Sequence, residues 1–249
     1  MRIGSVRSQP TRPEQTAAQA RDALMALADP AKAKFLAGFF KTGKGQYGEG
    51  DRFLGINVPS IRKVAKVFHN LPLPDCEELL QSEYNDARLL ALIILVNHYA
   101  KGNDEIQGLV FDTYLKRRQF VNNWNLVDAS APYIAGGHLL RRSRAMLYQL
   151  GQSKSLWDRR IAIVATFAFI RQDDFVDTLR ITEQLLGDQH DLIHKACGWM
   201  LREVGKRDQT VLEQFLRQFY RQMPRTMLRY AIERFTPAVR NAYLAGEIA

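Results

Sequence analysis

One amphipathic helical segment recurs along the chain, and this recurrence restricts the fold more than any other feature. Each copy starts with polar or basic residues and continues with an apolar face. The copies read ARLLALIILVNHYA, NNWNLVDASAPYIA, DRRIAIVATFAFIR, HKACGWMLREVGKR and RTMLRYAIERFTPA. A single helix cannot bury such a face alone, so neighbouring copies are expected to stack on one another. The recurrence therefore predicts an all-α protein.

Helical periodicity covers almost the whole chain, and alternating strand patterns with hairpin turns are absent. It predicts helices over residues 15–27, 31–40, 60–68, 75–81, 85–100, 104–119, 124–135, 142–150, 155–170, 175–186, 192–206, 210–222 and 225–234. The spacing of the copies is close to that of HEAT-type repeats. We expect a right-handed solenoid of HEAT-like antiparallel helix pairs with a concave basic cleft, because the basic helix starts would line the inner surface.

Amino-acid composition limits the cellular compartment and the class of partner that we expect. The net charge of +9 favours a polyanionic partner. No apolar window reaches the roughly 18 to 20 residues of a membrane helix, and the basic N-terminus lacks the apolar core of a secretory signal. Two cysteines do not suggest a disulfide framework and fit a reducing cytosol. We therefore expect a monomeric, cytoplasmic protein without a membrane partner. Residues 1–14 are expected to be a flexible basic arm and residues 15–249 a single HEAT-like repeat domain.

The tryptophans mark a candidate site. Trp124 and Asp128 lie at positions i and i+4, so an indole and a carboxylate share one helix face. Arg160 and Trp199 come from the next two copies of the segment. Aromatic faces, a carboxylate and a guanidinium on a basic surface suggest a site for a cationic, sugar-linked substrate. The third tryptophan, Trp157, is more typical of a core position.

Five segments are similar to those of a known protein family. They read FFKTGKGQYGEGDRFLGINVPSIRKVAK, NWNLVDASAP, LWDRRIAIV, KACGWMLREVGK and MPRTMLRYAIERF. In this order, over about residues 35–235, they resemble the AlkD-like DNA alkylation repair family. The resemblance implies a HEAT-like fold and glycosylase activity on N3- and N7-alkylated purines in double-stranded DNA. It also implies that no metal or organic cofactor is used, and that the lesion can stay in or near the base stack.

The resemblance also implies roles for single residues. Asp128 matches the family's catalytic carboxylate, Arg160 its catalytic-site arginine, and Trp124 and Trp199 its cleft aromatics. Arg62, in VPSIRK, matches an arginine that contacts the DNA backbone.

Two positions depart from the family pattern. Asn125 stands where an acidic residue is common, and Val58 stands where a polar residue can contact DNA. Both departures bear on DNA affinity more than on chemistry.

Further residues are expected at the DNA. The glycine-rich loop over residues 43–50 lacks the spacing of a nucleotide-binding loop, and its Tyr47 can approach DNA. We also expect Arg159, Arg202 and Lys206 to bind DNA. The cluster formed by Arg141, Arg142 and Arg144 is equally compatible with a solvated face and a phosphate track. The histidines show no ligand spacing, so no metal site is predicted.

These residue types fit one reaction. An N3- or N7-alkylated purine is a cationic leaving group, and the transition state is oxocarbenium-like at the sugar. An ionised Asp128 would stabilise that charge and orient water, and the indoles would attract the cationic nucleotide. Arg160 would hold a flanking phosphate and keep Asp128 ionised. The first hypothesis is therefore a monofunctional DNA-alkylpurine glycosylase. Two alternatives stay open: a non-catalytic DNA-binding HEAT-repeat protein that recognises damaged or unusual DNA, and a protein-binding scaffold.

Overall fold

Helices form nearly all of the regular structure in the computed structural model, which describes residues 15–248. The expected arm over residues 1–14 lies outside the described residues. The α-helices are α1 (Ala17–Met25), α2 (Pro30–Phe39), α3 (Val58–Val67), α4 (Leu73–Leu80), α5 (Asn85–Lys101), α6 (Asp104–Lys116), α7 (Trp124–Ser130), α8 (Gly137–Leu139), α9 (Ala145–Gly151), α10 (Leu156–Ala165), α11 (Phe167–Ile170), α12 (Val176–Gln184), α13 (Asp191–Arg207), α14 (Gln209–Phe219), α15 (Arg225–Ala231) and α16 (Pro237–Ala245). Two short segments complete them, the 3-10 helix η1 (Arg118–Phe120) and the π-helix η2 (Pro132–Gly136). The same residues contain no strand, only an isolated bridge between Arg52 and Tyr84, so the all-α prediction is confirmed.

Local sequence explains where many of the helices begin. The N-cap side chains that accept a backbone N–H are Thr16, Asp29, Asn57, Asn103, Asn123, Ser155, His190 and Asp208. All but the histidine are of the types that best satisfy the unpaired donors of a first helical turn. Thr16 and Gln19 complete a reciprocal capping box at α1.

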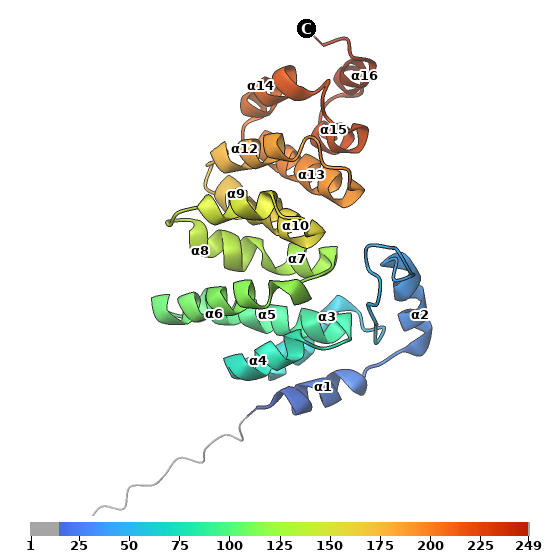
Figure 1. The fold of residues 1–249 in the computed structure, drawn as a ribbon, viewed down its shortest axis with the longest axis vertical. Coiled ribbons are helices and arrows are strands. Elements are labelled where there is room, and N and C mark those ends of the chain that lie inside the picture. Colours follow the sequence, from blue (N-terminus) through green and yellow to red (C-terminus); the bar gives the residue numbers. More distant parts are fainter. Residues whose placement is uncertain (1–14, 249) are drawn as a thin grey trace, which may run out of the picture.

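The helices are layered along the long axis of the molecule (Figure 1). Within this arrangement α5 packs against α7, α7 against α10, α10 against α13, and α13 against α15. One cluster of buried apolar residues extends from Ala17 to Tyr243. Helix α2 and the loop that follows it stand to one side of the layers (Figure 1). The starts of α7, α10 and α13 therefore follow one another along the molecule.

The helix expected over residues 124–135 is longer than predicted and changes its winding. Pro132 has no N–H, so it cannot donate to the Asp128 carbonyl four residues earlier. The chain continues as η2, in which the Gly136 N–H donates to the Ala131 carbonyl at 2.8 Å, and then as α8. Gly136 also packs closely on α10, because an added Cβ would lie 2.2 Å from the Ala165 carbonyl oxygen. The proline thus alters the winding one turn after the predicted catalytic carboxylate.

Two further helices differ from the prediction. The helix expected over residues 155–170 is divided at Thr166 into α10 and α11, and the Thr166 hydroxyl donates to the Ile163 carbonyl at 2.7 Å. Helix α16 was not predicted, although Pro237 stands in its first turn. None of the described helices combines the length and the apolar character needed to cross a membrane.

Candidate functional site

A buried carboxylate fixes the start of α7. Asp51, in the loop between α2 and α3, pairs with Arg88 of α5, and both side chains are only 4% exposed. Asp51 also accepts a hydrogen bond from the Asn123 amide at 2.7 Å. The Asn123 oxygen in turn accepts the backbone N–H of Trp124 at 2.8 Å. The loop, α5 and the first turn of α7 are therefore held together.

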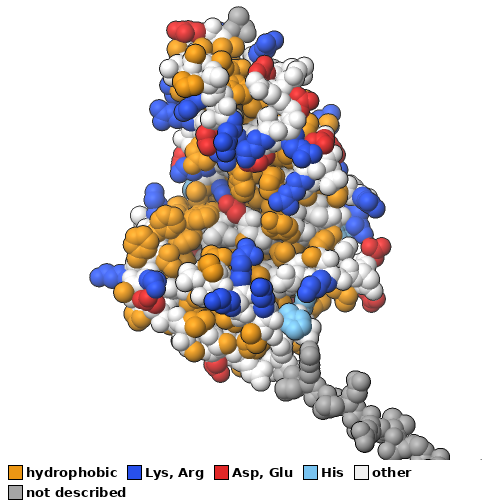
Figure 2. Space-filling view, turned by 180° about the vertical axis from the view of Figure 1, so that it is seen from behind, with side chains coloured by type: hydrophobic (Ala, Val, Ile, Leu, Met, Phe, Trp, Pro, Cys, Tyr) orange, Lys and Arg blue, Asp and Glu red, His pale blue; other side chains and the backbone are white. Residues whose placement is uncertain are grey.

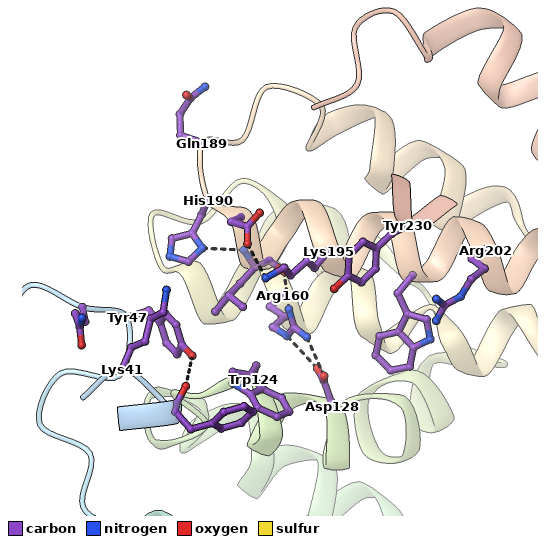
Figure 3. Close-up of a pocket in the computed structure, with 15 residues that line it drawn as sticks. Lys41, Tyr47, Trp124, Asp128, Arg160, Gln189, His190, Lys195, Arg202 and Tyr230 are labelled. Atoms are coloured by element: carbon purple, nitrogen blue, oxygen red, sulfur yellow. Dashed lines mark hydrogen bonds and ion pairs between the residues drawn. The ribbon is translucent and has the colours of Figure 1, made fainter. Parts of the chain in front are cut away.

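Trp124 stands at this fixed helix start. Its indole stacks on Phe40, with ring centroids 5.0 Å apart, and meets the ring edge of Phe39 at 6.0 Å. Asp128 follows one turn later, and its carboxylate points into the same pocket (Figure 3). The i and i+4 spacing therefore places the two side chains together, as expected.

Arg160 reaches Asp128 from α10. Its Nε donates to Oδ1 at 2.9 Å and its Nη2 donates to Oδ2 at 2.8 Å, which is the bidentate geometry of a guanidinium and a carboxylate (Figure 3). Nη1 donates to the Leu192 carbonyl at 2.5 Å. The Arg160 side chain is 6% exposed and that of Asp128 is 22% exposed. The arginine is therefore enclosed by protein, while the carboxylate keeps an open side toward the pocket.

Burial and the ion pair with Arg160 shift the pKa of Asp128 in opposite directions. Burial raises the pKa of its carboxyl above the ordinary value, and the Arg160 guanidinium opposes that increase. Nearby, burial lowers the pKa of the His190 imidazole, whose Nδ1 accepts the Leu192 backbone N–H at 3.1 Å. The histidine at this rim therefore favours its neutral form, and the carboxylate is the principal charge partner of Arg160.

Trp199 and Tyr230 line the opposite side of the pocket. The indole N–H of Trp199 donates to Glu203 at 3.2 Å, one turn along α13. Gly198 precedes Trp199, and an added Cβ there would lie 2.4 Å from the Met227 carbonyl oxygen. This close approach of α13 and α15 brings Tyr230 to the pocket.

The resulting cavity has a volume of about 860 Å³ and lies between the N-terminal part of the chain and α13 (Figure 3). Its lining combines Trp124, Asp128, Arg160 and Trp199, the four residues predicted as catalytic. We call this cavity the carboxylate pocket. Its remaining lining residues are Phe39, Lys41, Gln46, Tyr47, Gln189, His190, Asp191, Leu192, Lys195, Arg202 and Tyr230.

Two of the residues predicted to bind DNA line this pocket. Tyr47 is the first of them. Its ring packs at a steep angle against the rings of Trp157 and His190, with centroids 6.2 Å and 6.4 Å away, respectively. Arg202 lines it too, but its guanidinium pairs with Glu233. Trp157 is partly buried against the core and does not line the pocket, which agrees with the core position favoured for it.

The other predicted DNA-binding residues lie outside the pocket lining. Arg159 pairs with Asp188 at 2.6 Å and donates to two backbone carbonyls, so its guanidinium is occupied within the protein. Lys206 pairs with Glu203 at 2.7 Å and is 40% exposed. Arg62 is exposed on α3 and has no hydrogen-bond or ion-pair partner among residues 15–248. Their roles at DNA stay predictions.

The arginine cluster formed by Arg141, Arg142 and Arg144 contains one residue that is held by carboxylates of the protein. Arg144 pairs with Asp174 at 2.6 Å and Asp177 at 2.5 Å, and its guanidinium lies 3.9 Å from the centroid of the Phe169 ring. Arg144 is therefore a structural residue. Arg141 and Arg142 stay exposed.

Sequence reasoning missed several lining residues, chiefly Phe39, Lys41, Lys195 and Tyr230. Lys195 pairs with Asp191 at 2.7 Å, and this i, i+4 spacing was a local signal that could have drawn attention to it. Phe39 and Tyr230 lie far from Trp124 and Trp199 in sequence, so no spacing connected them. Within residues 15–248 no three His, Cys, Asp or Glu side chains form a group able to hold a metal ion.

Comparisons with known proteins bear on the family and the fold. The sequence model of the family described as "DNA alkylation repair enzyme" matches residues 20–235. A search of curated proteins found no match. A solved structure described as a predicted DNA alkylation repair enzyme from Enterococcus faecalis has a TM-score of 0.66. It is 16% identical in sequence, and the match covers 84% of this chain and 97% of that one, which shows a shared fold. The family match extends over most of the chain, and this protein therefore belongs to the DNA alkylation repair enzyme family.

Proposed function

We propose that the protein is a monofunctional DNA glycosylase that removes positively charged N3- and N7-alkylated purines from duplex DNA. Water adds to the sugar carbon C1′, the bond from C1′ to the purine nitrogen breaks, and the bonding electrons leave with the base. The attacking water loses a proton to the solvent and becomes the sugar hydroxyl. Alkylation at N3 or N7 makes the base cationic, so the base departs as a neutral molecule without prior protonation. Catalysis then depends on stabilising positive charge that develops on the sugar.

The observation that most directly supports this function is the bidentate pair of Asp128 and Arg160 on one wall of a pocket lined by two tryptophans. Asp128 keeps an open side toward the cavity, where its negative charge would stabilise an oxocarbenium-like sugar and orient the attacking water. Trp124 and Trp199 offer π faces that attract a cationic nucleotide, worth about 0.5 to 2 kcal/mol each.

Arg160 acts through Asp128 in this proposal. Three of its N–H groups are used by Asp128 and Leu192, and its side chain is 6% exposed. We therefore assign it the task of positioning the carboxylate and keeping it ionised, in place of the phosphate contact expected from sequence. Phosphate contacts fall to exposed cations such as Lys41, which lines the pocket, and Arg62 on α3, which lies outside its lining.

The architecture in this proposal is a right-handed, HEAT-like solenoid acting as one domain, with the carboxylate pocket in a concave basic cleft. The ordered succession of α7, α10 and α13, whose N-terminal ends bring Trp124, Arg160 and His190 to one cavity, supports it. A duplex lying along these helix starts would place its backbone against the pocket. Undamaged duplex would bind the same track through its phosphates.

Base release tests the proposal. We expect the wild-type protein to release 7-methylguanine and 3-methyladenine from alkylated duplex DNA. Asp128→Asn keeps the side-chain shape but removes the charge, which should lower the rate by roughly 30- to 1000-fold, as for a catalytic electrostatic group of about 2 to 4 kcal/mol. Asp173→Asn is the matched control, because Asp173 pairs with Arg207 at the surface, away from the pocket.

The outcomes separate the two DNA-dependent hypotheses. A wild-type rate in Asp128→Asn would remove Asp128 from the chemistry. Tight DNA binding without any base release by the wild type would favour the non-catalytic DNA-binding protein.

A further inference from the structure

A second cavity lies on the far side of Phe39. It has a volume of about 470 Å³, within the usual range of small-ligand sites. We call it the aromatic pocket, because its lining includes Phe35, Phe39, Phe40, Phe53, Asn85 and Asn125. The carboxylate pocket does not use these side chains, apart from Phe39, which lines both cavities.

The outer wall of the aromatic pocket is unusually exposed. Phe35 is 71% exposed and Phe39 is 56% exposed, and the two rings stack with centroids 6.4 Å apart and planes inclined by 13°. Val58, across the cavity, is 44% exposed. Figure 2 shows hydrophobic side chains gathered on the side of the molecule where α2 lies. A contiguous exposed apolar patch of this kind marks a binding surface, whereas a single exposed phenylalanine would not.

Two asparagines, Asn85 and Asn125, interrupt the otherwise apolar lining of the aromatic pocket. The Asn125 amide donates to the Asn85 oxygen at 2.7 Å, and Asn85 donates to Asp51 at 3.0 Å. This chain fixes the orientation of Asn125. Its amide keeps a second N–H, and its oxygen accepts only the long 3.4 Å contact from Asn85. The edge of Asn125 that carries a donor beside an acceptor therefore faces Asn85, and the second N–H is the donor that remains for a ligand.

The aromatic pocket adjoins the surfaces already assigned to DNA. Phe39 meets Trp124 edge to face, at 6.0 Å between centroids, so the two cavities are separated by aromatic rings alone at this point. On the other side, Ile61 of α3 lines the aromatic pocket, and Arg62 follows it as an exposed cation. A nucleotide whose base entered the cavity would have a candidate phosphate partner beside it.

We propose that the aromatic pocket binds one unstacked nucleobase of the DNA held at the carboxylate pocket, with Phe35 and Phe39 stacking on its face and Asn125 contacting its edge. This inference rests on the proposed function for the presence of DNA at the neighbouring cavity. The bound base is a nucleotide other than the lesion, whose sugar occupies the carboxylate pocket. Aromatic walls suit any base face, and the remaining N–H of Asn125 can donate to an acceptor on the base edge, which every base offers.

Undamaged DNA with a single unpaired nucleotide tests this inference without requiring catalysis. Binding of the full chain is measured by fluorescence anisotropy for three duplexes: a fully paired one, one with a bulged adenosine, and one with a bulged abasic tetrahydrofuran. The abasic bulge bends DNA similarly but carries no base. We expect the wild type to bind the adenosine bulge about 5- to 100-fold more tightly than the abasic bulge, the range that stacking on aromatic side chains provides.

Single substitutions test whether the preference for a bulged base arises in the aromatic pocket. Phe35→Ala should reduce the ratio of the two bulge affinities to nearly one, and Asn125→Leu, which removes a single hydrogen-bond donor, should lower it by a smaller factor. Leu109→Ala is the matched control, because Leu109 is 47% exposed on α6 and lines neither pocket. Its ratio should equal that of the wild type.

Each result decides the proposal. Equal wild-type affinity for the two bulges overturns it and leaves the apolar surface to a protein partner. An unchanged ratio in Phe35→Ala also overturns it, because the base would then bind elsewhere. Base release is measured separately, so a protein that excises no alkylated purine but prefers the adenosine bulge would lose the proposed reaction and keep the aromatic pocket.

Discussion

At the scale of single residues, Asp128 and Arg160 differ sharply in their exposure to the pocket. The guanidinium is enclosed and uses three N–H groups, while the carboxylate keeps an open side. Burying either charge without a partner would cost free energy. The bidentate pair gives each charge its partner, and the Leu192 carbonyl accepts a further N–H of Arg160. The arrangement leaves one negative charge available to a cationic substrate.

The pKa of Asp128 leads to a pH prediction. Burial raises this pKa, with the arginine opposing, so the carboxylate is neutralised at a higher pH than an ordinary aspartate at about 3.9. Base release by the wild type should therefore fall as the solution becomes mildly acidic, and should stay constant above that range. Rates are measured across acidic and neutral pH, with uncatalysed release subtracted. The residual rate of Asp128→Asn should lack this acid limb; an identical limb in the variant would assign the titration to another group.

At the scale of helices, the site depends on close backbone approach between elements. Asp51 connects the loop after α2 to α5 and, through Asn123, to α7. Gly198 allows α13 to lie against α15, where an added Cβ would be 2.4 Å from the Met227 carbonyl oxygen and 2.5 Å from the Tyr230 Cβ. Small changes in these contacts would move whole walls of the pocket.

Gly198→Ala tests this dependence on helix packing. A methyl group cannot fit against backbone without moving α15, so we expect a loss of about 1 to 3 kcal/mol in unfolding free energy. That loss corresponds to a decrease in Tm of roughly 2 to 12 °C for a chain of this size. Gly108→Ala in α6 is the control, because nothing lies within 4 Å of its added Cβ, and helix propensity should leave it unchanged or slightly more stable. Equal Tm values for the two variants would show that the helices can separate without cost.

At the scale of the whole molecule, the count of 35 lysines and arginines overstates the number of cations available to DNA. Arg144, Arg159 and Arg202 are held by carboxylates of their own chain. The available positive charge therefore depends on acidic partners such as Glu233, whose side chain is 49% exposed beside Arg202. A DNA phosphate must displace such a partner to reach the arginine.

Removing this internal competitor should strengthen DNA binding. In Glu233→Gln the Arg202 guanidinium loses its closer anionic partner and keeps only the longer contact with Glu203 at 3.7 Å. Undamaged duplex should therefore bind about 2- to 10-fold more tightly at low salt, roughly one additional phosphate contact. The slope of log affinity against log salt should steepen by about 0.9. Glu78→Gln, which removes the partner of Arg21 at the far end of the chain, is the control and should leave both quantities unchanged. A steeper slope in the control alone, or in neither variant, would place Arg202 outside the DNA contact.

The sequence by itself determined the all-α fold, most helix positions and the grouping of Trp124 with Asp128, because helical periodicity and capping act over a few residues. Pro132 is a local signal too, and its missing N–H explains a change of winding that periodicity did not reveal. The recurrence of the helical segment added Arg160 and Trp199 to the same site, the family resemblance implied their roles, and the structure brings all four residues to one cavity.

Only the tertiary structure decided how distant side chains are paired. It placed Phe39 and Tyr230 at the pocket, held Arg159 against Asp188, and enclosed Arg160 so that it faces Asp128. It also exposed an aromatic cavity beside Asn125, which the sequence had marked only as a departure from the family pattern. These outcomes depend on which helices meet and how closely they pack. Such contacts join residues far apart along the chain, where a repeating local pattern carries no information about the partner.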